Sequence, residues 1–249
     1  MSSDPGPAAP ALTVSVVVPI RNEEGNIAPL LAEITNALEN VPHEILYVND
    51  GSSDESATIL ANLRGAYPAL RVLNHGRSAG QSAAIRSGVF AARAPVIATL
   101  DGDGQNNPAF LPAMLAIIEA GEGEIGLVQG QRLGRKDTPF KRWQSRTANA
   151  IRGALLQDGT RDTGCGLKVF SRKAYLALPY FDALHRFMPA LIKREGYLIA
   201  HHDVVDRPRN TGVSNYGFWG RLKVGAIDLL GVFWLIKRRK PAPSVEELR

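Results

Sequence analysis

Short apolar runs alternate along the chain with stretches in which apolar positions recur at helical spacing. The runs are rich in Val and Ile and are bounded by polar or turn residues, which is typical of buried strands. Between them, stretches such as residues 27–40 (IAPLLAEITNALEN) and 56–67 (SATILANLRGAY) predict helices with one apolar face. The predicted strands are residues 13–19, 43–50, 69–75, 95–101 and 124–130.

This alternation predicts an α/β fold with a mainly parallel sheet that is flanked by helices. The strands are almost continuously apolar, as expected where helices cover both faces of the sheet. In such sheets ligands bind at the carboxyl ends of the strands, near the point where the strand order reverses. Polar clusters follow three of the predicted strands, at residues 19–24, 49–54 and 101–105, so we expect one site at this edge.

The second half of the chain, from about residue 140, loses this regular alternation. Residues 141–157 predict a helix, residues 162–170 predict a glycine-kinked turn into a strand, and residues 181–197 predict a helix that ends at Gly196. We expect this half to close over the edge of the sheet and to hold the second substrate.

The C-terminal segment combines an apolar run with flanking aromatic and basic residues. The run from Val224 to Ile236 contains Asp228 and is shorter than the roughly 20 residues that a membrane-spanning helix needs. The flanking Phe and Trp residues and the cluster Lys237–Lys240 favour amphipathic helices in a membrane interface. The alternative is a helix packed on the domain's own core or on another subunit. We therefore divide the chain into a disordered tail (residues 1–12), a folded domain (13–212) and interfacial helices with a basic tail (213–249).

The length of 249 residues suits one compact domain with an appendage. The single cysteine, Cys165, excludes an intramolecular disulfide, and the first residues lack the basic-then-apolar order of a signal peptide. We therefore expect a reducing, cytoplasmic location. The net charge of +5 is concentrated in residues 132–146 and 237–240, which indicates an anionic partner, either phosphates or a membrane face. No zinc-ligand spacing or RNA-recognition signature accompanies the basic residues, which disfavours nucleic acid as the partner.

The stretch DGDGQNNP, which follows the fourth predicted strand, places Asp101, Asp103 and Gln105 at alternate positions. These residues offer only oxygen ligands, which favours a hard cation such as Mg²⁺ or Mn²⁺. An EF-hand loop is excluded because its sixth position would be Asn106 and its twelfth Pro112. An ion held by one or two carboxylates completes its shell with substrate phosphates. The sequence therefore predicts a cation site that binds together with a phosphorylated ligand.

The other two polar strand ends offer groups for a nucleotide. Asp50 lies at the tip of the second predicted strand, where we assign it no structural role and expect its carboxylate to accept hydrogen bonds from a base or ribose. Asp54 is interpreted as a helix cap. Arg21 and Glu23 follow the first strand at the same edge.

Two further motifs occur in the sequence. GEGEIG matches the dinucleotide-binding pattern, but it follows a predicted helix and precedes a strand, which inverts the required context. GRSAG matches the nucleophile elbow of serine hydrolases, with His185, His201 and His202 as candidate bases. The polar residues Asn74 and His75, which break the strand just before GRSAG, count against this hydrolase alternative.

Taken together, the motifs resemble the family 2 glycosyltransferases of the GT-A fold. The resemblance is closest to the dolichol-phosphate mannose synthase group and its bacterial polyprenyl-phosphate relatives. It extends from about residue 13 to residue 225. The segments that carry it are VVVPIRNEEGN, YVNDGSSDES, NHGRSAGQSAAIRSG, TLDGDGQNNP, VQGQR, TGCGLKVFSR, HRFMPALI and RPRNTGVSNYGFWGRLKVG.

The resemblance implies a GT-A, Rossmann-like fold and a role for each matching residue. The implied nucleotide-binding residues are Pro19, Arg21, Glu23, Asp50, Asp101 and Arg132. The implied metal ligands are Asp101, Asp103 and Gln105, the catalytic candidates are Asp103 and Asp162, and the phosphate or acceptor contacts are Arg146 and Arg209. The sequence has Asn215 where the family usually has lysine, and Arg221 or Lys223 could replace that cation.

The implied activity is metal-dependent, inverting transfer of one sugar from GDP-mannose or a UDP-sugar to a polyprenyl phosphate, dolichyl or undecaprenyl, at the cytoplasmic face of the inner membrane. A lipid phosphate is already ionised near neutral pH, so it needs no general base. One alternative acceptor is a sugar hydroxyl, which requires a carboxylate base such as Asp162 or Asp182. Another alternative is a catalytically silent sugar-nucleotide-binding or scaffold protein. The interfacial tail could also pair subunits into a homo-oligomer.

Overall fold

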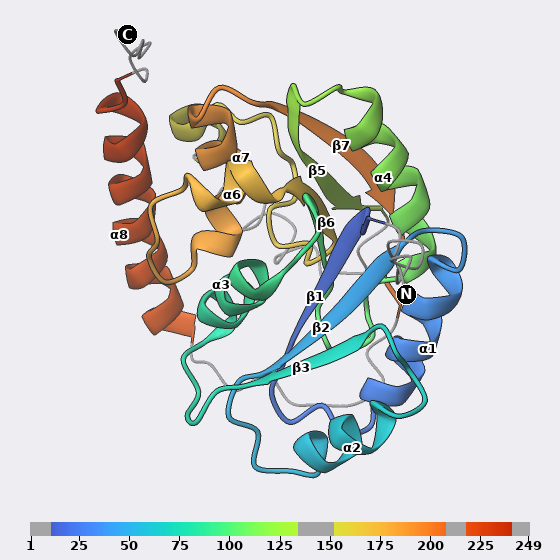
Figure 1. The fold of residues 1–249 in the computed structure, drawn as a ribbon. Helices are drawn as coiled ribbons and strands as arrows, with labels where there is room; N and C mark the ends of the chain where they lie inside the picture. Colours follow the sequence, from blue (N-terminus) through green and yellow to red (C-terminus); the bar gives the residue numbers. More distant parts are fainter. Residues whose placement is uncertain (1–10, 134–151, 208–217, 241–249) are drawn as a thin grey trace, which may run out of the picture.

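The computed structural model describes residues 11–133, 152–207 and 218–240. A seven-stranded sheet occupies its centre, with helices on both faces (Figure 1). The strands are β1 (Val14–Ile20), β2 (His43–Asn49), β3 (Leu70–Asn74), β4 (Val96–Thr99), β5 (Ile125–Arg132), β6 (Lys168–Ser171) and β7 (Leu198–Val204). The helices are α1 (Ile27–Ala37), α2 (Ser56–Leu63), α3 (Gln81–Ala91), η1 (Pro108–Phe110), α4 (Leu111–Ala120), α6 (Arg172–Leu176), α7 (Leu184–Arg194) and α8 (Phe218–Lys237).

The strand order is β3-β2-β1-β4-β6-β5-β7. Every neighbouring pair is parallel except the two pairs that involve β6, which runs antiparallel to both β4 and β5. The chain moves outward from β1 to β2 and β3, and then returns to β4 on the other side of β1. The strand order therefore reverses between β1 and β4, where such sheets bind their ligands.

Side chains alternate across the central strands and fill two separate cores. Val16 and Val18 of β1 pack in the core that contains residues of α1 and α4, whereas Val17 packs in the core that contains residues of α3, α7 and α8. Figure 1 shows these two groups of helices on opposite faces of the sheet. The predicted parallel α/β architecture is confirmed, and its five predicted strands correspond to β1 to β5. The edge strand β3 is only partly buried, because no strand covers its outer side.

The second half of the chain contributes strands to the same sheet. The turn predicted at residues 162–170 leads into β6, and the predicted helix at 181–197 contains α7. The strand β7 was not predicted because its segment, LIAHHDV, mixes apolar residues with two histidines and an aspartate. The strand expected in this half is therefore present as β6, and the sheet also includes β7, which the sequence did not predict. Of the helix predicted at residues 141–157, residues 152–156 are helical and residues 141–151 lie outside the described part.

The helix α8 packs one face on the domain and exposes another. Val232 is 1% exposed in the core shared with α7, as the alternative of packing on the domain's own core predicts. Ile227, Leu230 and Trp234 are 70%, 63% and 60% exposed on the opposite face. None of the helices in the described ranges is both long and apolar enough to cross a bilayer. Most of the predicted disordered tail, residues 1–10, lies outside the described residues.

Candidate active site

The ends of β1, β2 and β4 bring the three predicted polar clusters to one edge of the sheet. Pro19, near the end of β1, and Asp101, just after β4, line the same pocket. Arg21 is exposed directly after β1. Glu23 accepts a hydrogen bond from the Asn26 side chain at 2.7 Å and is held in the loop that follows the strand. The expected convergence of these clusters at the carboxyl edge is therefore present.

Asp50, at the end of β2, has an extensive structural role that the sequence analysis did not assign. The carboxylate is 4% exposed and accepts hydrogen bonds from His75 Nδ1 and Ser78 Oγ, both at 2.7 Å. The backbone N–H groups of Ala79 and Gly80 also donate to it, each at 2.8 Å. A carboxylate offers about four acceptor positions, so these donors occupy its capacity. The expectation that Asp50 has no structural duty is wrong, and its contact with a nucleotide stays a prediction.

The loop that Asp50 holds continues into α3 and from there reaches Asp101. The loop approaches Gly51 closely: a Cβ atom on Gly51 would lie 2.6 Å from Ser78 N, and its φ of +66° also favours glycine. Gln81, the first residue of α3, donates a hydrogen bond to Asp101 Oδ1 at 2.7 Å. The strand ends β2 and β4 are thus linked through the start of α3.

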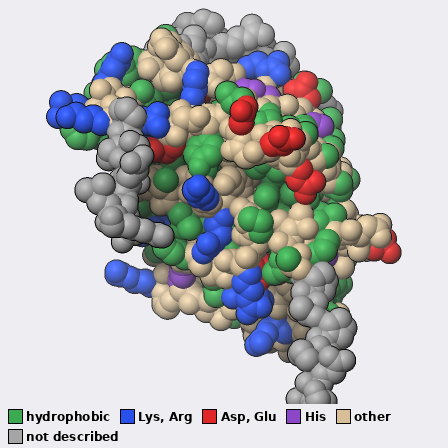
Figure 2. Space-filling view, turned by 45° about the horizontal axis from the view of Figure 1, so that its top comes forward, with side chains coloured by type: hydrophobic (Ala, Val, Ile, Leu, Met, Phe, Trp, Pro, Cys, Tyr) green, Lys and Arg blue, Asp and Glu red, His purple; other side chains and the backbone are tan. Residues whose placement is uncertain are grey.

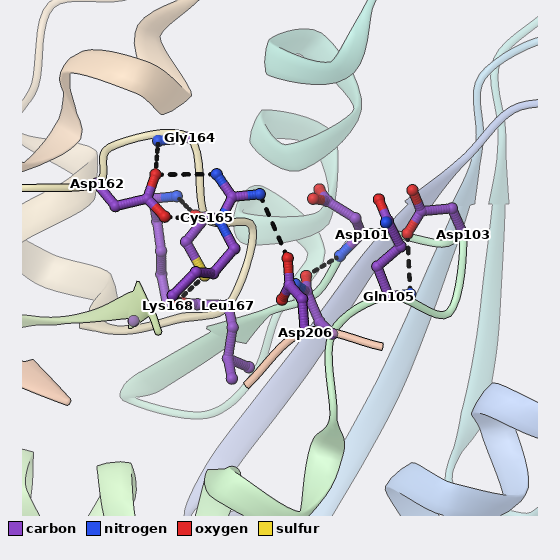
Figure 3. A network of polar contacts seen from close by, with 12 residues as sticks. Asp101, Asp103, Gln105, Asp162, Gly164, Cys165, Leu167, Lys168 and Asp206 are labelled. Atoms are coloured by element: carbon purple, nitrogen blue, oxygen red, sulfur yellow. Dashed lines mark hydrogen bonds and ion pairs between the residues drawn. The ribbon is translucent and has the colours of Figure 1, made fainter. Parts of the chain in front are cut away.

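The acidic loop after β4 presents Asp101, Asp103 and Gln105 to one region (Figure 3). Asp103 Oδ1 accepts a hydrogen bond from the Gln105 backbone N–H at 3.1 Å, which fixes the tight turn between them. Gly166 faces Asp101 so closely that a Cβ atom there would lie 2.3 Å from the carboxyl carbon. Glycine at position 166 therefore leaves the space that the Asp101 carboxylate occupies.

The donor set of this loop fits a hard divalent cation. Burial raises the pKa of Asp101, the Lys168 ammonium opposes the rise, and the neighbouring charge of Asp103 adds to it. A cation between the two carboxylates would offset the electrostatic repulsion between them. No group of three His, Cys, Asp or Glu residues within the described ranges forms a complete metal site. The ion would therefore take protein ligands from Asp101, Asp103 and the Gln105 amide and fill its shell with phosphate and water.

Arg132, at the end of β5, is held by two carboxylates. Its Nε and Nη2 donate to the two oxygens of Asp162 at 2.6 and 2.9 Å, and its Nη1 donates to Asp206 at 3.3 Å. These contacts raise the pKa of Arg132 above its ordinary value, chiefly through the Asp162 hydrogen bond. The side chain of Asn106 donates to Asp206 at 3.3 Å and so connects this network to the acidic loop. A phosphate bound by Arg132, as predicted, would therefore compete with Asp162 and Asp206 for the N–H groups of the guanidinium.

A pocket of about 270 Å³ lies beside Asp101, between the first residues of α3 and α7. Three of its polar lining residues, Lys168, His185 and Arg186, were not assigned to the nucleotide, metal or phosphate site from the sequence. Lys168 is 3% exposed in β6 and donates through Nζ to the Cys165 carbonyl. A lysine inside the otherwise apolar strand segment LKVF was the available signal, because buried lysines are rare without a function or partner.

The serine hydrolase alternative is not supported by the positions of its candidate residues. Ser78 of GRSAG donates to Asp50 at 2.7 Å. Among the candidate bases, His185 contacts Ser82 at 2.7 Å, His201 contacts Thr160 at 3.2 Å, and His202 packs against Phe110. The motif GEGEIG connects α4 to β5, so it has the inverted context that excludes a dinucleotide loop.

Several predicted residues lie outside the described part of the chain. They include Arg146, Arg209 and Asn215, so their expected phosphate contacts stay predictions. Arg221 and Lys223 fall within α8, but their side chains are likewise outside the described set.

Comparisons of the sequence identify related proteins. Residues 15–178 match the family described as Glycosyl transferase family 2. The chain is 34% identical over 238 residues to the dodecaprenyl-phosphate galacturonate synthase of Rhizobium johnstonii, which covers 91% of this chain and 68% of the relative. It is 36% identical over 186 residues to the undecaprenyl-phosphate 4-deoxy-4-formamido-L-arabinose transferase of Pseudomonas fluorescens, covering 73% of this chain and 54% of that protein. The chain therefore spans about half to two thirds of the length of these relatives.

Solved structures share the fold. The glucosyl-3-phosphoglycerate synthase of Mycobacterium tuberculosis, in complex with Mn²⁺, UDP and phosphoglyceric acid, matches with a TM-score of 0.67 at 18% identity, covering 93% of this chain and 80% of that one. A mannosyltransferase from Pyrobaculum calidifontis, in complex with GDP-Man and Mn²⁺, matches with a TM-score of 0.66 at 20% identity. The match covers 92% of this chain and 65% of that one. These likenesses confirm the expected GT-A fold.

Proposed function

The chain belongs to glycosyl transferase family 2, and from that premise we propose that it transfers one sugar from a nucleotide-sugar donor to a polyprenyl phosphate. One observation carries this proposal. Asp101, Asp103 and Gln105 lie beside the end of β1, at the point where the strand order reverses. The relatives named for dodecaprenyl and undecaprenyl phosphates support the acceptor class. They are named for two different sugars, galacturonate and a formamido-arabinose, which leaves the donor sugar open.

The donor's diphosphate would lie against the acidic loop, with Pro19, Arg21 and Glu23 along the nucleotide. Asp101, Asp103 and Gln105 would hold Mg²⁺ or Mn²⁺, which when bound offsets the charge that develops on the departing nucleoside diphosphate. Solved neighbours of the same fold in complex with Mn²⁺ or Mg²⁺ support this assignment. The glycine at 102 packs against Pro19 O and Ile20, so the acidic loop stays close to the end of β1.

The reaction would be a single in-line displacement. A phosphate oxygen of the lipid forms the bond to the anomeric carbon while the bond to the nucleoside diphosphate breaks on the opposite side, which inverts the anomeric configuration. Arg132 occupies both carboxylate oxygens of Asp162, so the geometry favours a positioning role for Asp162 over that of a base. Asp182 is exposed and accepts from the Ala183 backbone N–H at 2.8 Å, at the start of α7. An already ionised acceptor phosphate fits this arrangement better than a sugar hydroxyl does.

The acceptor lipid requires contact with a membrane, and α8 offers the surface for it. Its exposed apolar face, formed by Ile227, Leu230 and Trp234, is followed by the exposed basic residues Lys237–Lys240. An apolar helix face beside a basic cluster suits the interface of an anionic bilayer. On the face drawn in Figure 2, Lys and Arg side chains gather on the left and along the middle, whereas Asp and Glu lie mainly on the right. We propose peripheral binding at the inner face of the membrane through α8.

Vesicle flotation tests this binding. The protein should float with vesicles that contain phosphatidylglycerol and stay behind with pure phosphatidylcholine, because the basic cluster adds an electrostatic attraction of about 1 kcal/mol per residue. The change Trp234→Ser should weaken flotation several-fold, whereas Leu198→Ser, a similarly exposed position at the start of β7, serves as the matched control. If both variants floated as well as the unchanged protein, α8 would not be the membrane-binding element.

The transfer itself is tested with radiolabelled donors. The purified protein is incubated with a membrane lipid extract, Mg²⁺ or Mn²⁺, and a panel of labelled GDP- and UDP-sugars. We expect label from at least one donor to enter the organic phase as an acid-labile glycosyl phosphate, and chelation by EDTA to prevent it. Label that stays in the aqueous phase with every donor would contradict the proposed function.

A further inference from the structure

The acidic loop, which runs from residue 101 to residue 107, needs contacts from outside to keep one shape. It contains Gly102 and Gly104, of which Gly104 has a φ of +73°. Glycines leave the backbone free to adopt many conformations. Two carboxylates and an amide on such a loop bind a cation well only when their oxygens are held in one arrangement. The residues that hold this loop therefore influence the affinity of the cation site.

Two consecutive residues just after β7, Asp206 and Arg207, contact three consecutive residues of this loop. The Arg207 backbone N–H donates to the Gln105 carbonyl at 2.9 Å. Asp206 Oδ1 accepts from the Asn106 side chain at 3.3 Å, and Figure 3 shows Asp206 beside the acidic loop. The Arg207 guanidinium donates through Nη2 to Asn107 Oδ1 at 2.7 Å. The loop is thus attached, residue by residue, to the end of a strand that lies far away in the sequence.

The Arg207 guanidinium is fixed on its other side by α1. Its Nη1 donates to the two carboxylate oxygens of Glu33 at 2.8 and 2.7 Å. Asn107, its partner in the loop, also accepts from the Ala109 backbone N–H at 3.0 Å and so caps η1. The planar guanidinium therefore joins α1, the acidic loop and the start of η1 in one geometry. The ammonium of a lysine lacks this rigid fork.

Asp206 connects a proposed cation ligand with a predicted phosphate contact. Asn106, which donates to Asp206, is 2% exposed and accepts from the Asp101 backbone N–H at 2.9 Å. The other oxygen of Asp206 accepts from Arg132 Nη1 at 3.3 Å. The contacts of Asp206 therefore lead to both groups that the donor diphosphate is proposed to meet.

We propose that Arg207 and Asp206 are positioning residues of the cation site. They hold the acidic loop in the shape in which Asp103 and Gln105 present their oxygens to one ion. They act through the loop and need no contact of their own with the ion or the donor. This inference rests on the proposed metal-dependent transfer and assigns the geometry of its cation site to the end of β7. Removing an outer contact of this kind typically lowers metal affinity or activity by roughly 10- to 100-fold.

The Mn²⁺ dependence of nucleotide binding tests this role without an acceptor lipid. Calorimetric titrations with UDP and with GDP are repeated at a series of Mn²⁺ concentrations. In Arg207→Ala the Mn²⁺ concentration that gives half-maximal nucleotide binding should rise roughly tenfold. Arg207→Lys should recover part of this loss, because it keeps the charge without the fork. In the transfer assay excess Mn²⁺ should restore the rate of Arg207→Ala, because mass action compensates for weaker binding.

Arg71→Ala is the matched control. Arg71 pairs with Glu44 and donates to the Ala91 carbonyl, so its loss also breaks an arginine–glutamate pair, but near the amino ends of β2 and β3. It should lower the stability in urea and leave the Mn²⁺ dependence unchanged. Hydrogen exchange of the metal-free protein gives a second comparison. Peptides that cover residues 101–107 should exchange faster in Arg207→Ala and at the unchanged rate in Arg71→Ala.

The results separate this inference from the transfer itself. If Arg207→Ala and Arg71→Ala matched the unchanged protein in Mn²⁺ dependence and in exchange of the loop, the positioning role would be overturned, whichever sugar is transferred. A failure to label the lipid would contradict the proposed function and leave this comparison intact. If Arg207→Ala does not fold, Glu33→Gln decides, since weakening the pair should shift the Mn²⁺ dependence in the same direction. An unshifted Glu33→Gln would then overturn the inference.

Discussion

Replacing Asp103 with asparagine is expected to reduce sugar transfer by roughly 100- to 1000-fold, the range typical for the loss of one strong electrostatic contact to a transition state. Asparagine keeps the side-chain oxygen that accepts the Gln105 backbone N–H at 3.1 Å, so the turn of the acidic loop should be preserved. What it removes is the negative charge that a divalent cation needs beside Asp101. The measurements are initial rates of lipid labelling and the Mn²⁺ dependence of nucleotide-sugar binding.

The matched control for this variant is Asp203→Asn, which removes an equal charge from the exposed side of β7. It should retain full transfer because its ion pair with Arg161 lies at the surface, where such pairs contribute little. If Asp103→Asn retained donor binding, metal dependence and transfer, the acidic loop would not be the metal site.

Replacing Asp50 with alanine is expected to destabilise the protein by about 2–4 kcal/mol, because four hydrogen-bond donors lose their acceptor at a buried position. The affected groups are the side chains of His75 and Ser78 and the backbone N–H groups of Ala79 and Gly80. Transfer should fall as well, because this loop leads into Gln81, which holds Asp101. Urea unfolding followed by circular dichroism measures the stability change.

The contribution of Asp50 to the stability of the folded protein should decrease in acid. Burial alone would raise the pKa of Asp50, but its hydrogen bonds from Ala79, His75, Ser78 and Gly80 bring it below its ordinary value. A carboxylate with a lowered pKa stabilises the folded state fully above the ordinary carboxyl pKa, and this contribution is lost as the pH falls through the lower folded value. The stability difference between the unchanged protein and Asp50→Asn should therefore be constant near neutral pH and shrink below about pH 4.

Asp54→Ala provides the comparison for Asp50. Asp54 accepts from the backbone N–H groups of Glu24 and Ser56 at 3.2 and 3.1 Å and is more exposed than Asp50. The N-cap of α2 is Glu55 rather than Asp54, but Asp54 accepts from the Ser56 N–H at the start of the helix, so its loss should cost about 1 kcal/mol, as for a helix cap. A smaller effect at Asp50 than at Asp54, or a difference for Asp50→Asn that persists unchanged into acid, would contradict the structural role assigned to Asp50.

The first half of the fold was predictable because each of its strands is a continuous apolar run between helices of clear periodicity. The polar clusters after β1, β2 and β4 could be placed together from topology alone, since parallel strands end at the same edge. The strand β7 was missed for two reasons. An edge strand needs fewer apolar residues, so its pattern is weaker. Its pairing with β5 also joins residues that lie far apart in the sequence, so LIAHHDV alone does not indicate it.

The roles of individual charged side chains were the less predictable part of the site. Asp50 and Arg132 were both assigned to ligands, and in the structure both are engaged by protein groups that lie far away in the sequence, such as Ala79 and Asp162. The sequence also carries no local signal that Ser82 contacts His185, because the two residues are 103 positions apart. Which partner a carboxylate or imidazole meets depends on how the loops at the sheet edge fold over one another.

The identity of the acceptor group tests the proposed function most directly. Labelled transfer is measured from the best donor to undecaprenyl phosphate and, in parallel, to undecaprenol, which has the same chain with a hydroxyl in place of the phosphate. We predict an acid-labile product from the phosphate alone, with the anomeric configuration inverted relative to the donor. Transfer to undecaprenol at a comparable rate, or a product that retains the donor's configuration, would contradict attack by an ionised lipid phosphate.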